Sequence, residues 1–177
     1  MNLDFWANKN ILITGHTGFK GSWLSVLLNH LGANVYGLSD KKKDGIYEVI
    51  ENSNILKKEF FHNINRLTKE EAKNILEEIK PDIVFHFAAQ SLVYEGYLIP
   101  LDTIETNILG TYKIMSYIEE LSEANLLTIS TTDKVYLNPE IDNTEENELG
   151  GKDFYSASKA GAEFVISAFL NFTIAWT

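Results

Sequence analysis

The stretch "NILITGHTGFKGSWLSVLLNHL", residues 10–31, decides the fold. It opens with a short apolar run at 10–14 that is rich in β-branched residues, which is typical of a buried strand. Residues 22–31 carry apolar side chains at helical spacing, and Gly32 is well placed to end that helix. A strand, a glycine-rich turn and a helix in this order predict the first half of a βαβ unit.

Three glycines join the predicted strand to the predicted helix: Gly15, Gly18 and Gly21, spaced G-x-x-G-x-x-G. Glycine permits a tight turn and lets the backbone approach a pyrophosphate closely, and the N–H groups at the start of the helix favour the anion. The spacing differs from the simplest dinucleotide fingerprint, G-x-G-x-x-G, so a purely structural turn is the alternative. After the first strand of a βαβ unit, the loop predicts a dinucleotide-binding site.

The rest of the chain alternates strands and helices. Thr68 and Glu71 form a capping box at the start of one helix, and residues 39–56 are expected to be a loop with a short helix. Further strands are expected at residues 33–38, 82–89, 125–130 and 172–176, and further helices at residues 69–80, 101–121 and 155–170. The strands are apolar at successive positions, which indicates a parallel sheet covered on both faces. We therefore expect an α/β fold with a Rossmann-like, doubly wound parallel sheet.

The composition is that of a globular protein, because 45% of the 177 residues are hydrophobic and 23% are charged. The net charge of −10 disfavours a nucleic-acid partner. No apolar run approaches the ~18–20 residues of a membrane helix, and the N-terminal "MNLDFWANKN" lacks the apolar segment of a signal peptide. The sequence has no cysteine, so it forms no disulfide. We expect a cytoplasmic protein with no membrane partner.

An acidic residue about 20 positions after the glycines usually binds the adenosine ribose of the dinucleotide. Ser39 and Asp40 follow the second predicted strand, near that place. Asp40 would favour NAD and repel the additional phosphate of NADP. The neighbouring lysines 41–43 argue the reverse, and we expect NAD.

The sequence "YSASK" places Tyr155 and Lys159 four residues apart, on one face of a predicted helix. A free tyrosine has a pKa near ~10, and a neighbouring ammonium lowers it by stabilising the phenolate. Such a tyrosine can take a proton from a substrate hydroxyl while a hydride leaves the same carbon. The lysine can also bond the nicotinamide ribose. Alone the pair is commonly a surface feature, but behind a glycine-rich βα turn it predicts dehydrogenase chemistry.

Five motifs, "GHTGFKGSWLS", "FHFAAQSLV", "ETNILGT", "TTDKVY" and "LGGKDFYSASKAGAE", together resemble the extended short-chain dehydrogenase/reductase superfamily. More narrowly, the chain resembles the CDP-glucose 4,6-dehydratases, and the motifs cover nearly its whole length in the right order. The related dTDP-glucose dehydratases have Asp–Glu where this chain has Asp133–Lys134. The resemblance implies an NAD-dependent nucleotide-sugar 4,6-dehydratase. An epimerase or reductase of the same superfamily is the alternative enzyme.

The resemblance also implies a mechanism. A hydride leaves sugar C4 to NAD⁺ with Tyr155 as base, the C5 proton and the C6 hydroxyl are then lost as water, and the hydride returns to C6. Thr132 would bond the C4 hydroxyl, and Asp133 would protonate the departing hydroxyl. Lys134 would act near C5, either as base or as a charge that stabilises the enolate. A lysine serves as base only if its pKa is far below ~10.4, and burial in the pocket is expected to lower it.

Further roles carry over from the resemblance. Gln90 would face the sugar, and Asn107 would brace the end of the sheet near the active site. Besides the glycines, Asp40, Asn107, Tyr155 and Lys159, the cofactor residues would be Thr17, Phe19, Lys20, Asn63, Ile64, Phe87, Ala88 and Ala89. The family commonly has Asp–Ile at positions 63–64, and it has basic residues where Tyr94 and Glu95 stand. His86 lies in an apolar strand and is interpreted as a core histidine, and no cluster has metal-ligand spacing.

Members of this family are longer, and their remaining part completes the sheet and builds a substrate domain. We therefore expect residues 1–177 to form an NAD-binding Rossmann-like domain, with the C-terminal substrate domain absent. The partner implied is a nucleotide sugar. A truncated, inactive dinucleotide-binding remnant is the non-enzymatic alternative. The nucleotide, the sugar, the formation of a homo-oligomer and the exact role of Lys134 are left open by the sequence.

Overall fold

The computed structural model describes residues 3–138 and 140–175, and side chains from Asp4 to Asn171 with the exception of position 139. The chain divides into two compact units. The first, here called the sheet unit, comprises Met1–Ala88 and Ser116–Ser130, and the second, here called the helical unit, comprises Ala89–Met115 and Thr131–Thr177.

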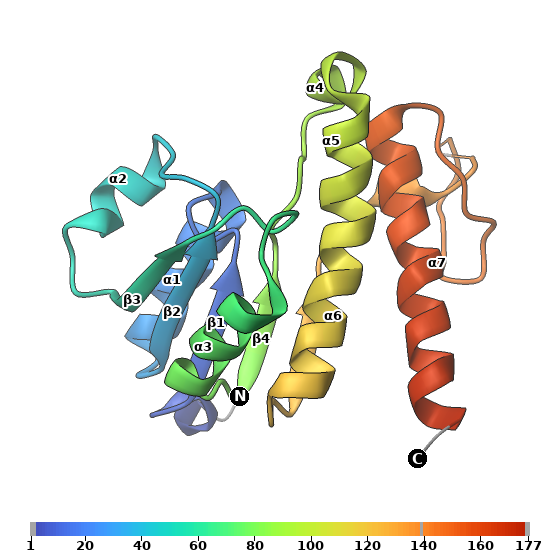
Figure 1. Cartoon of the computed structure of the whole chain (residues 1–177). Helices are drawn as coiled ribbons and strands as arrows, with labels where there is room; N and C mark the ends of the chain where they lie inside the picture. The colour runs from blue at the N-terminus through green and yellow to red at the C-terminus, as the bar shows by residue number, and fades with distance from the viewer. Residues whose placement is uncertain (1–2, 139, 176–177) are drawn as a thin grey trace. The chain divides into compact units, whose positions relative to one another are not determined.

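A parallel five-stranded sheet forms the centre of the sheet unit (Figure 1), in the order β3-β2-β1-β4-β5. The strands are β1 (Asn10–Thr14), β2 (Asn34–Ser39), β3 (Leu56–Phe61), β4 (Ile83–His86) and β5 (Leu126–Ile129). Neighbouring strands are parallel throughout. The order reverses direction between β1 and β4, which is the topological switch point of a doubly wound fold. The predicted fold class is confirmed.

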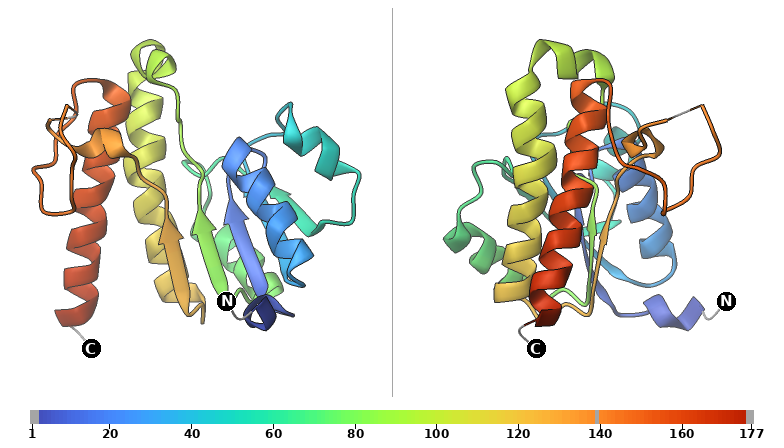
Figure 2. Two further views of the ribbon diagram at one scale, coloured as in Figure 1. Left: turned by 180° about the vertical axis from the view of Figure 1, so that it is seen from behind. Right: turned by 90° about the vertical axis from the view of Figure 1, so that its right-hand side faces the viewer.

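The helices are α1 (Phe19–His30), α2 (Ile46–Glu51), α3 (Lys69–Ile79), α4 (Val93–Leu98), α5 (Pro100–Ile104), α6 (Gly110–Leu121) and α7 (Phe154–Ala175). Short 3₁₀ turns lie at η1 (Leu3–Trp6) and η3 (Asp133–Val135), and a π-helical turn, η2 (Glu105–Leu109), joins α5 to α6. In the sheet unit, α1 and α3 lie on opposite faces of the sheet (Figure 2). Within the described residues, no helix is long and apolar enough to cross a membrane.

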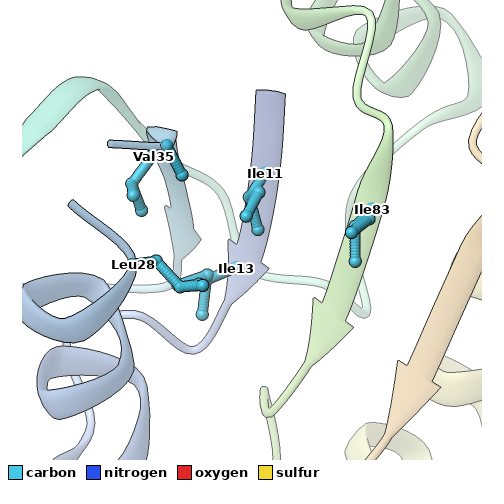
Figure 3. Close-up of a cluster of buried hydrophobic side chains, with 6 residues drawn as sticks. Ile11, Ile13, Leu28, Val35 and Ile83 are labelled. Atoms are coloured by element: carbon cyan, nitrogen blue, oxygen red, sulfur yellow. The ribbon is translucent and has the colours of Figure 1, made fainter. Parts of the chain in front are cut away.

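One hydrophobic cluster of the sheet unit lies between α1 and the sheet. Leu28 of α1 points toward Ile13 of β1, beside Ile11, Val35 and Ile83 (Figure 3). Each of these five side chains is at most 3% exposed. Full burial of such a side chain contributes about 1.5–3 kcal/mol, so the apolar runs that predicted the strands also hold them together.

Both predicted helix signals work as expected. At the end of α1, the N–H of Gly32 donates to Asn29 and that of Ala33 to Leu28, while Gly32 takes a φ of +83° that glycine tolerates best. At the start of α3, the Thr68 hydroxyl accepts from the Glu71 N–H, and the Glu71 carboxylate accepts from the Thr68 N–H. These bonds satisfy backbone groups that a helix end otherwise leaves without partners.

The strand β3 was not predicted. Its sequence, LKKEFF, places Lys57 and Lys58 in exposed positions and has no continuous apolar run. It is the edge strand beside β2, and an edge strand needs only one paired side and accepts charged residues. The short helix expected within residues 39–56 is present as α2.

The strand predicted at residues 172–176 is wrong for the part that the structure describes, because α7 continues to Ala175. Trp176 lies outside the described residues. The apolar, partly β-branched run "FTIA" resembles a strand, yet residues 162–175 contain neither glycine nor proline to stop the preceding helix. The predicted helix at 101–121 is present as the continuous run of α5, η2 and α6, and the short helix α4 is an addition.

Replacing Thr68 with alanine should lower the free energy of unfolding by about 1 kcal/mol, because α3 then loses its N-cap bond. Chemical denaturation followed by far-UV circular dichroism measures the change. Lys73→Ala, which removes an exposed side chain in the middle of the same helix, is the matched control and should change stability far less. Equal effects of the two substitutions would show that the capping box contributes nothing.

Candidate functional site

The predicted cofactor residues of the sheet unit gather at the carboxyl ends of its strands. Gly15 follows β1, Asp40 follows β2, Asn63 comes shortly after β3 and Phe87 follows β4. The carboxyl ends of parallel strands meet at one edge of a sheet, and that edge next to a switch point is where α/β proteins bind ligands. The fold therefore brings together residues that are up to 72 positions apart in β1 and β4.

The glycines of the loop have different structural needs. A Cβ on Gly15 would lie 2.7 Å from the Ala88 backbone nitrogen, and one on Gly21 would lie 2.3 Å from the Gly15 oxygen. Both positions therefore require glycine for packing alone. A Cβ on Gly18 would meet only the Gly15 oxygen, at 3.2 Å. Of the three loop glycines, Gly18 is the one that internal packing constrains least.

The other loop residues begin helix α1, which starts at Phe19 directly after Gly18. Phe19 is 77% exposed and Lys20 is exposed beside it, whereas Thr17 is buried. The Thr17 hydroxyl donates to the Lys41 carbonyl at 3.0 Å, which ties the loop to the segment after β2. The first turn of an α-helix leaves backbone N–H groups without intrahelical partners, and these suit an anion.

Residues after β2 and β3 border the loop. Ser39 is buried, whereas Asp40 is exposed at the end of β2. Of the lysines at 41–43, Lys42 pairs with Glu51. Asn63 is exposed and its side-chain oxygen accepts from the Asn65 N–H at 2.9 Å, while Ile64 is buried.

Phe87 and Ala88 continue directly from β4. The Phe87 N–H donates to the Thr14 carbonyl at 2.9 Å, and the Ala88 N–H to the Thr14 hydroxyl at 3.2 Å. His86 is 2% exposed, and its Nδ1 lies 2.7 Å from the same hydroxyl. A buried histidine bonded in this way agrees with the interpretation of His86 as a core residue.

One polar network in the sheet unit was not predicted. The His16 ring is fully buried, with Nε2 2.8 Å from Glu59 Oε1 and Nδ1 3.0 Å from the Ser39 hydroxyl. The Tyr47 hydroxyl donates to the same Glu59 oxygen at 2.8 Å. Burial raises the pKa of Tyr47, and its bond to the carboxylate adds to that effect. The histidine within the glycine loop was the one signal of this network in the sequence, but its partner Glu59 lies on strand β3, which was not predicted.

In the helical unit, helix α7 begins with the predicted Tyr155–Lys159 pair. Asp153 caps it: its carboxylate accepts from the Ser156 N–H at 3.0 Å and from the Ser156 hydroxyl at 2.7 Å. Tyr155 is partly exposed, whereas Lys159 is only 6% exposed. A Cβ on Gly151 would lie 2.2 Å from the Ala157 nitrogen, so the chain packs tightly against the first turn. The first turn of α7, which carries Tyr155, is therefore firmly held.

Asn107 lies within the π-helical turn η2, and its predicted role of bracing the end of the sheet stays a prediction. Its side-chain oxygen accepts from the Gln90 N–H at 2.9 Å, and its side-chain nitrogen donates to the Gln90 carbonyl at 2.9 Å and to the Ser158 hydroxyl at 2.8 Å. Ser158 in turn donates to the Tyr155 carbonyl at 2.8 Å. Both N–H groups of the amide and its oxygen are hydrogen-bonded, and the amide links η2 to the turn of α7 that carries Tyr155. A contact with a cofactor stays a prediction for this residue.

The Gln90 side chain is also engaged within its own segment. Its amide nitrogen donates to the Leu92 carbonyl at 3.0 Å and to the Thr103 hydroxyl at 2.9 Å, and its oxygen accepts from the Leu92 N–H at 2.6 Å. These bonds shape the turn before α4. Contact between Gln90 and a sugar stays a prediction.

The residues of "TTDKVY" form a turn around η3, with Val135 buried. Thr132 precedes η3, and its hydroxyl donates to Asp133 Oδ1 at 3.1 Å and accepts from the Lys134 N–H at 3.4 Å. Asp133 and Lys134 are both exposed. The burial expected for Lys134 is therefore not provided by the described residues of the helical unit. Thr131 bonds Glu163 of α7, an unpredicted contact that ties this turn to the helix.

No group of three or more His, Asp or Glu side chains within residues 3–138 and 140–175 is arranged to hold a metal ion. The candidate site thus consists of two sets of residues. The glycine loop and the strand ends belong to the sheet unit, and Thr132, Asp133, Lys134, Tyr155 and Lys159 belong to the helical unit.

Known proteins resemble this chain over most of its length. It is 39% identical over 172 residues to the CDP-glucose 4,6-dehydratase of Salmonella typhimurium, covering 95% of this chain and 47% of the relative. It is 32% identical to the dTDP-D-glucose 4,6-dehydratase of Dictyostelium discoideum, covering 95% of this chain and 42% of that protein. The chain thus spans about half the length of the curated relatives it matches.

Solved structures agree with the fold. An epimerase from Methanothermobacter thermautotrophicus superposes with a TM-score of 0.79 at 26% identity, over 96% of this chain and 49% of that one. The UDP-Glc/GlcNAc 4-epimerase of Campylobacter jejuni, at 23% identity, also gives 0.79, over 92% of this chain and 49% of that one.

The family model described as GDP-mannose 4,6 dehydratase matches residues 12–173. That range extends from within β1 to the last turn of α7 and includes the glycine loop, the turn after β5 and the Tyr155–Lys159 pair. The resemblance inferred from the motifs is confirmed by this match and by the identity to the dehydratases. The chain belongs to the GDP-mannose 4,6 dehydratase family.

Proposed function

We propose that this chain is the cofactor-binding part of an NAD-dependent nucleotide-sugar 4,6-dehydratase that acts on CDP-glucose. The observation that carries the proposal is the exposed Asp133–Lys134 turn directly after β5, because an acid at this place serves the loss of water and an epimerase has no need of one. The identity of 39% to a CDP-glucose 4,6-dehydratase supports the choice of sugar nucleotide.

The loop fits a dinucleotide. Gly15 and Gly21 hold the turn together, while the space over Gly18 and the first N–H groups of α1 suit a pyrophosphate. Asp40 is exposed at the end of β2, where the carboxylate can accept a hydrogen bond from a ribose hydroxyl. When bound, NAD⁺ would accept a hydride from sugar C4 and return it to C6.

The proton transfers belong to side chains of the helical unit. In the proposed reaction Tyr155 takes the proton of the C4 hydroxyl, and the Lys159 ammonium stabilises the phenolate that results. Asp133 gives a proton to the departing C6 hydroxyl. The Thr132 hydroxyl, bonded to Asp133 Oδ1, holds the carboxyl in place and aligns the C4 hydroxyl. The C5 proton would be taken either by Lys134 as base or by solvent water; in the second case the Lys134 ammonium, whose exposure suits a charged group, stabilises the negative charge that develops.

We propose that residues 1–177 form the NAD-binding domain. The relatives are about twice as long as the matched region, and their remaining half would supply the residues that read the nucleotide of the sugar. The protein is proposed to be a cytoplasmic enzyme whose partner is the nucleotide sugar.

The first test is cofactor choice. The chain should bind NAD⁺ more tightly than NADP⁺, and Asp40→Asn should reduce that preference about tenfold, because the charge that repels a 2′-phosphate is removed. Isothermal titration calorimetry of both nucleotides measures the ratio. Asp44→Asn, an exposed carboxylate four residues on, is the matched control and should leave the ratio unchanged. An unaltered ratio in Asp40→Asn would remove this residue from the ribose site.

The second test is the loop. Gly18→Val should abolish binding of either nucleotide in the same calorimetric assay, because the side chain would occupy the space proposed for the pyrophosphate. The melting temperature of the variant serves as the control for folding. A folded Gly18→Val chain that binds NAD⁺ normally would show that the loop is only a turn.

The third test separates the chemical steps in a preparation that converts CDP-glucose. Asp133→Asn should slow turnover about 10²–10⁴-fold, the typical contribution of a general acid. Reduced cofactor should accumulate and be seen by its absorbance, because C4 is oxidised and water is not lost. Tyr155→Phe should stop the first step, so no reduced cofactor should appear. Normal turnover of Asp133→Asn, or its failure before oxidation, would favour an epimerase or reductase instead.

A further inference from the structure

The His16 network of the sheet unit is not used by the proposed reaction. Its members come from three separate places: the glycine loop, the end of β2 and the middle of β3. His16 joins Ser39 on one side, at 3.0 Å, to Glu59 on the other, at 2.8 Å. Because both nitrogens of this fully buried imidazole are bonded, specific partners fix the position of the ring.

The surroundings of His16 are shaped to this ring. A Cβ on Gly37 would lie 2.4 Å from His16 Cγ, so β2 has a glycine where the ring passes. The ring centroids of Tyr47 and Phe61 lie 5.7 Å and 5.9 Å from that of His16. The Ser22 hydroxyl donates to the His16 carbonyl at 2.9 Å and fixes its backbone. The imidazole therefore has a single orientation.

The bonds define which nitrogen carries the proton. An ionised carboxylate accepts hydrogen bonds only, so His16 Nε2 donates to Glu59 Oε1. Burial lowers the pKa of His16, and the Glu59 carboxylate and the Leu38 carbonyl offset only part of that effect, which favours the neutral ring. In a neutral ring with Nε2–H, Nδ1 is an acceptor. The Ser39 hydroxyl must therefore donate its hydrogen inward, to Nδ1.

An inward hydrogen changes what Ser39 offers to a ligand. Its oxygen keeps only lone pairs for other partners, and the nearest donor, the Thr17 N–H, is at a long 3.4 Å. Ser39 is the residue before Asp40, at the strand end where a dinucleotide places its adenosine ribose. A ribose hydroxyl can donate to such an oxygen, whereas a 2′-phosphate brings only acceptors.

We propose that Glu59 and His16 are positioning residues that hold Ser39 as a hydrogen-bond acceptor, and that Ser39 thereby selects NAD⁺ over NADP⁺ together with Asp40. The inference rests on the proposed function, since it concerns the cofactor of the same site. Glu59 of strand β3 is the first residue in a series of hydrogen bonds that runs through His16 to Ser39.

The proposal is tested by replacing the imidazole of His16 with an aromatic ring that has no nitrogens. His16→Phe keeps the volume and the aromatic contacts, and it frees the Ser39 hydroxyl to turn outward and donate to a phosphate. The preference for NAD⁺ over NADP⁺, measured by calorimetry, should fall about tenfold, the scale of one hydrogen bond to a charged group. Adding Ser39→Ala to His16→Phe removes that donor and should restore most of the preference. A purely structural role of His16 would not be reversed in this way.

Tyr47→Phe is the matched control. It removes another bond to the same Glu59 oxygen but leaves His16 and Ser39 joined, so the preference should equal that of the unaltered chain. A wild-type ratio in His16→Phe, or a ratio in the double variant that stays as low as in His16→Phe, would overturn the proposal.

The proton positions can be observed without any nucleotide. Nitrogen-15 NMR of the unaltered chain should show His16 as the neutral ring with Nε2–H and an unprotonated Nδ1. A ring protonated at Nδ1, alone or together with Nε2, would overturn the inference. If the unaltered chain bound neither nucleotide, the proposed function would fail and Ser39 would lose its cofactor role, while the NMR result would still decide the direction of the Ser39 bond.

Discussion

The close approach of two backbones at the carboxyl end of the sheet is the constraint on which the rest of the sheet unit depends. The position of a Cβ on Gly15 is occupied by the backbone between Phe87 and Ala88, and Gly21 is equally restricted by the Gly15 carbonyl. Because glycine has no side chain at these two positions, β1 can turn directly into α1 beside the end of β4. The same tight turn aims the first N–H groups of α1 at the open edge of the sheet, where an anion can meet them. The packing of the loop and its proposed binding of an anion thus depend on the same tight turn. Gly18 is the position where a substitution can test binding separately from packing.

Local signals predicted the buried strands and the two helices whose ends carry recognisable stop or cap residues. Strand β1, helix α1 with its glycine stop, and helix α3 with its capping box all follow from residues close together in sequence. Strand β3 escaped because an edge strand needs no continuous apolar run: LKKEFF becomes a strand through its pairing with β2. At residues 172–175 the error was the opposite one. A run with β-branched residues was predicted to be a strand, but helix α7 continues through it because no glycine or proline within residues 162–175 interrupts the helix.

The same distinction between local and non-local signals applies to the residues of the candidate site. The glycine loop and the Tyr155–Lys159 pair are local patterns with a known chemical purpose, and the sequence could predict them. The bonds that hold them are not local. Asn107 is joined to Ser158 across 51 positions, and His16 to Glu59 across 43. No spacing rule predicts such partners, and for His16 the partner's own strand was missing from the prediction. The exposure of Lys134 likewise depends on the local fold of the turn around η3, which composition does not reveal.

The saturated amide of Asn107 has a consequence for the chemical ageing of the protein. Asparagine is among the thermolabile residues, which proteins of extreme thermophiles use sparingly. Hydrolysis of this one side chain would give an aspartate of nearly the same shape. A carboxylate, however, cannot donate to the Gln90 carbonyl or the Ser158 hydroxyl, and it would bring an unpaired charge into a fully buried position. Conversion of this single amide to an acid would therefore weaken the link between η2 and α7, whereas the same conversion at an exposed asparagine would break no such buried bonds.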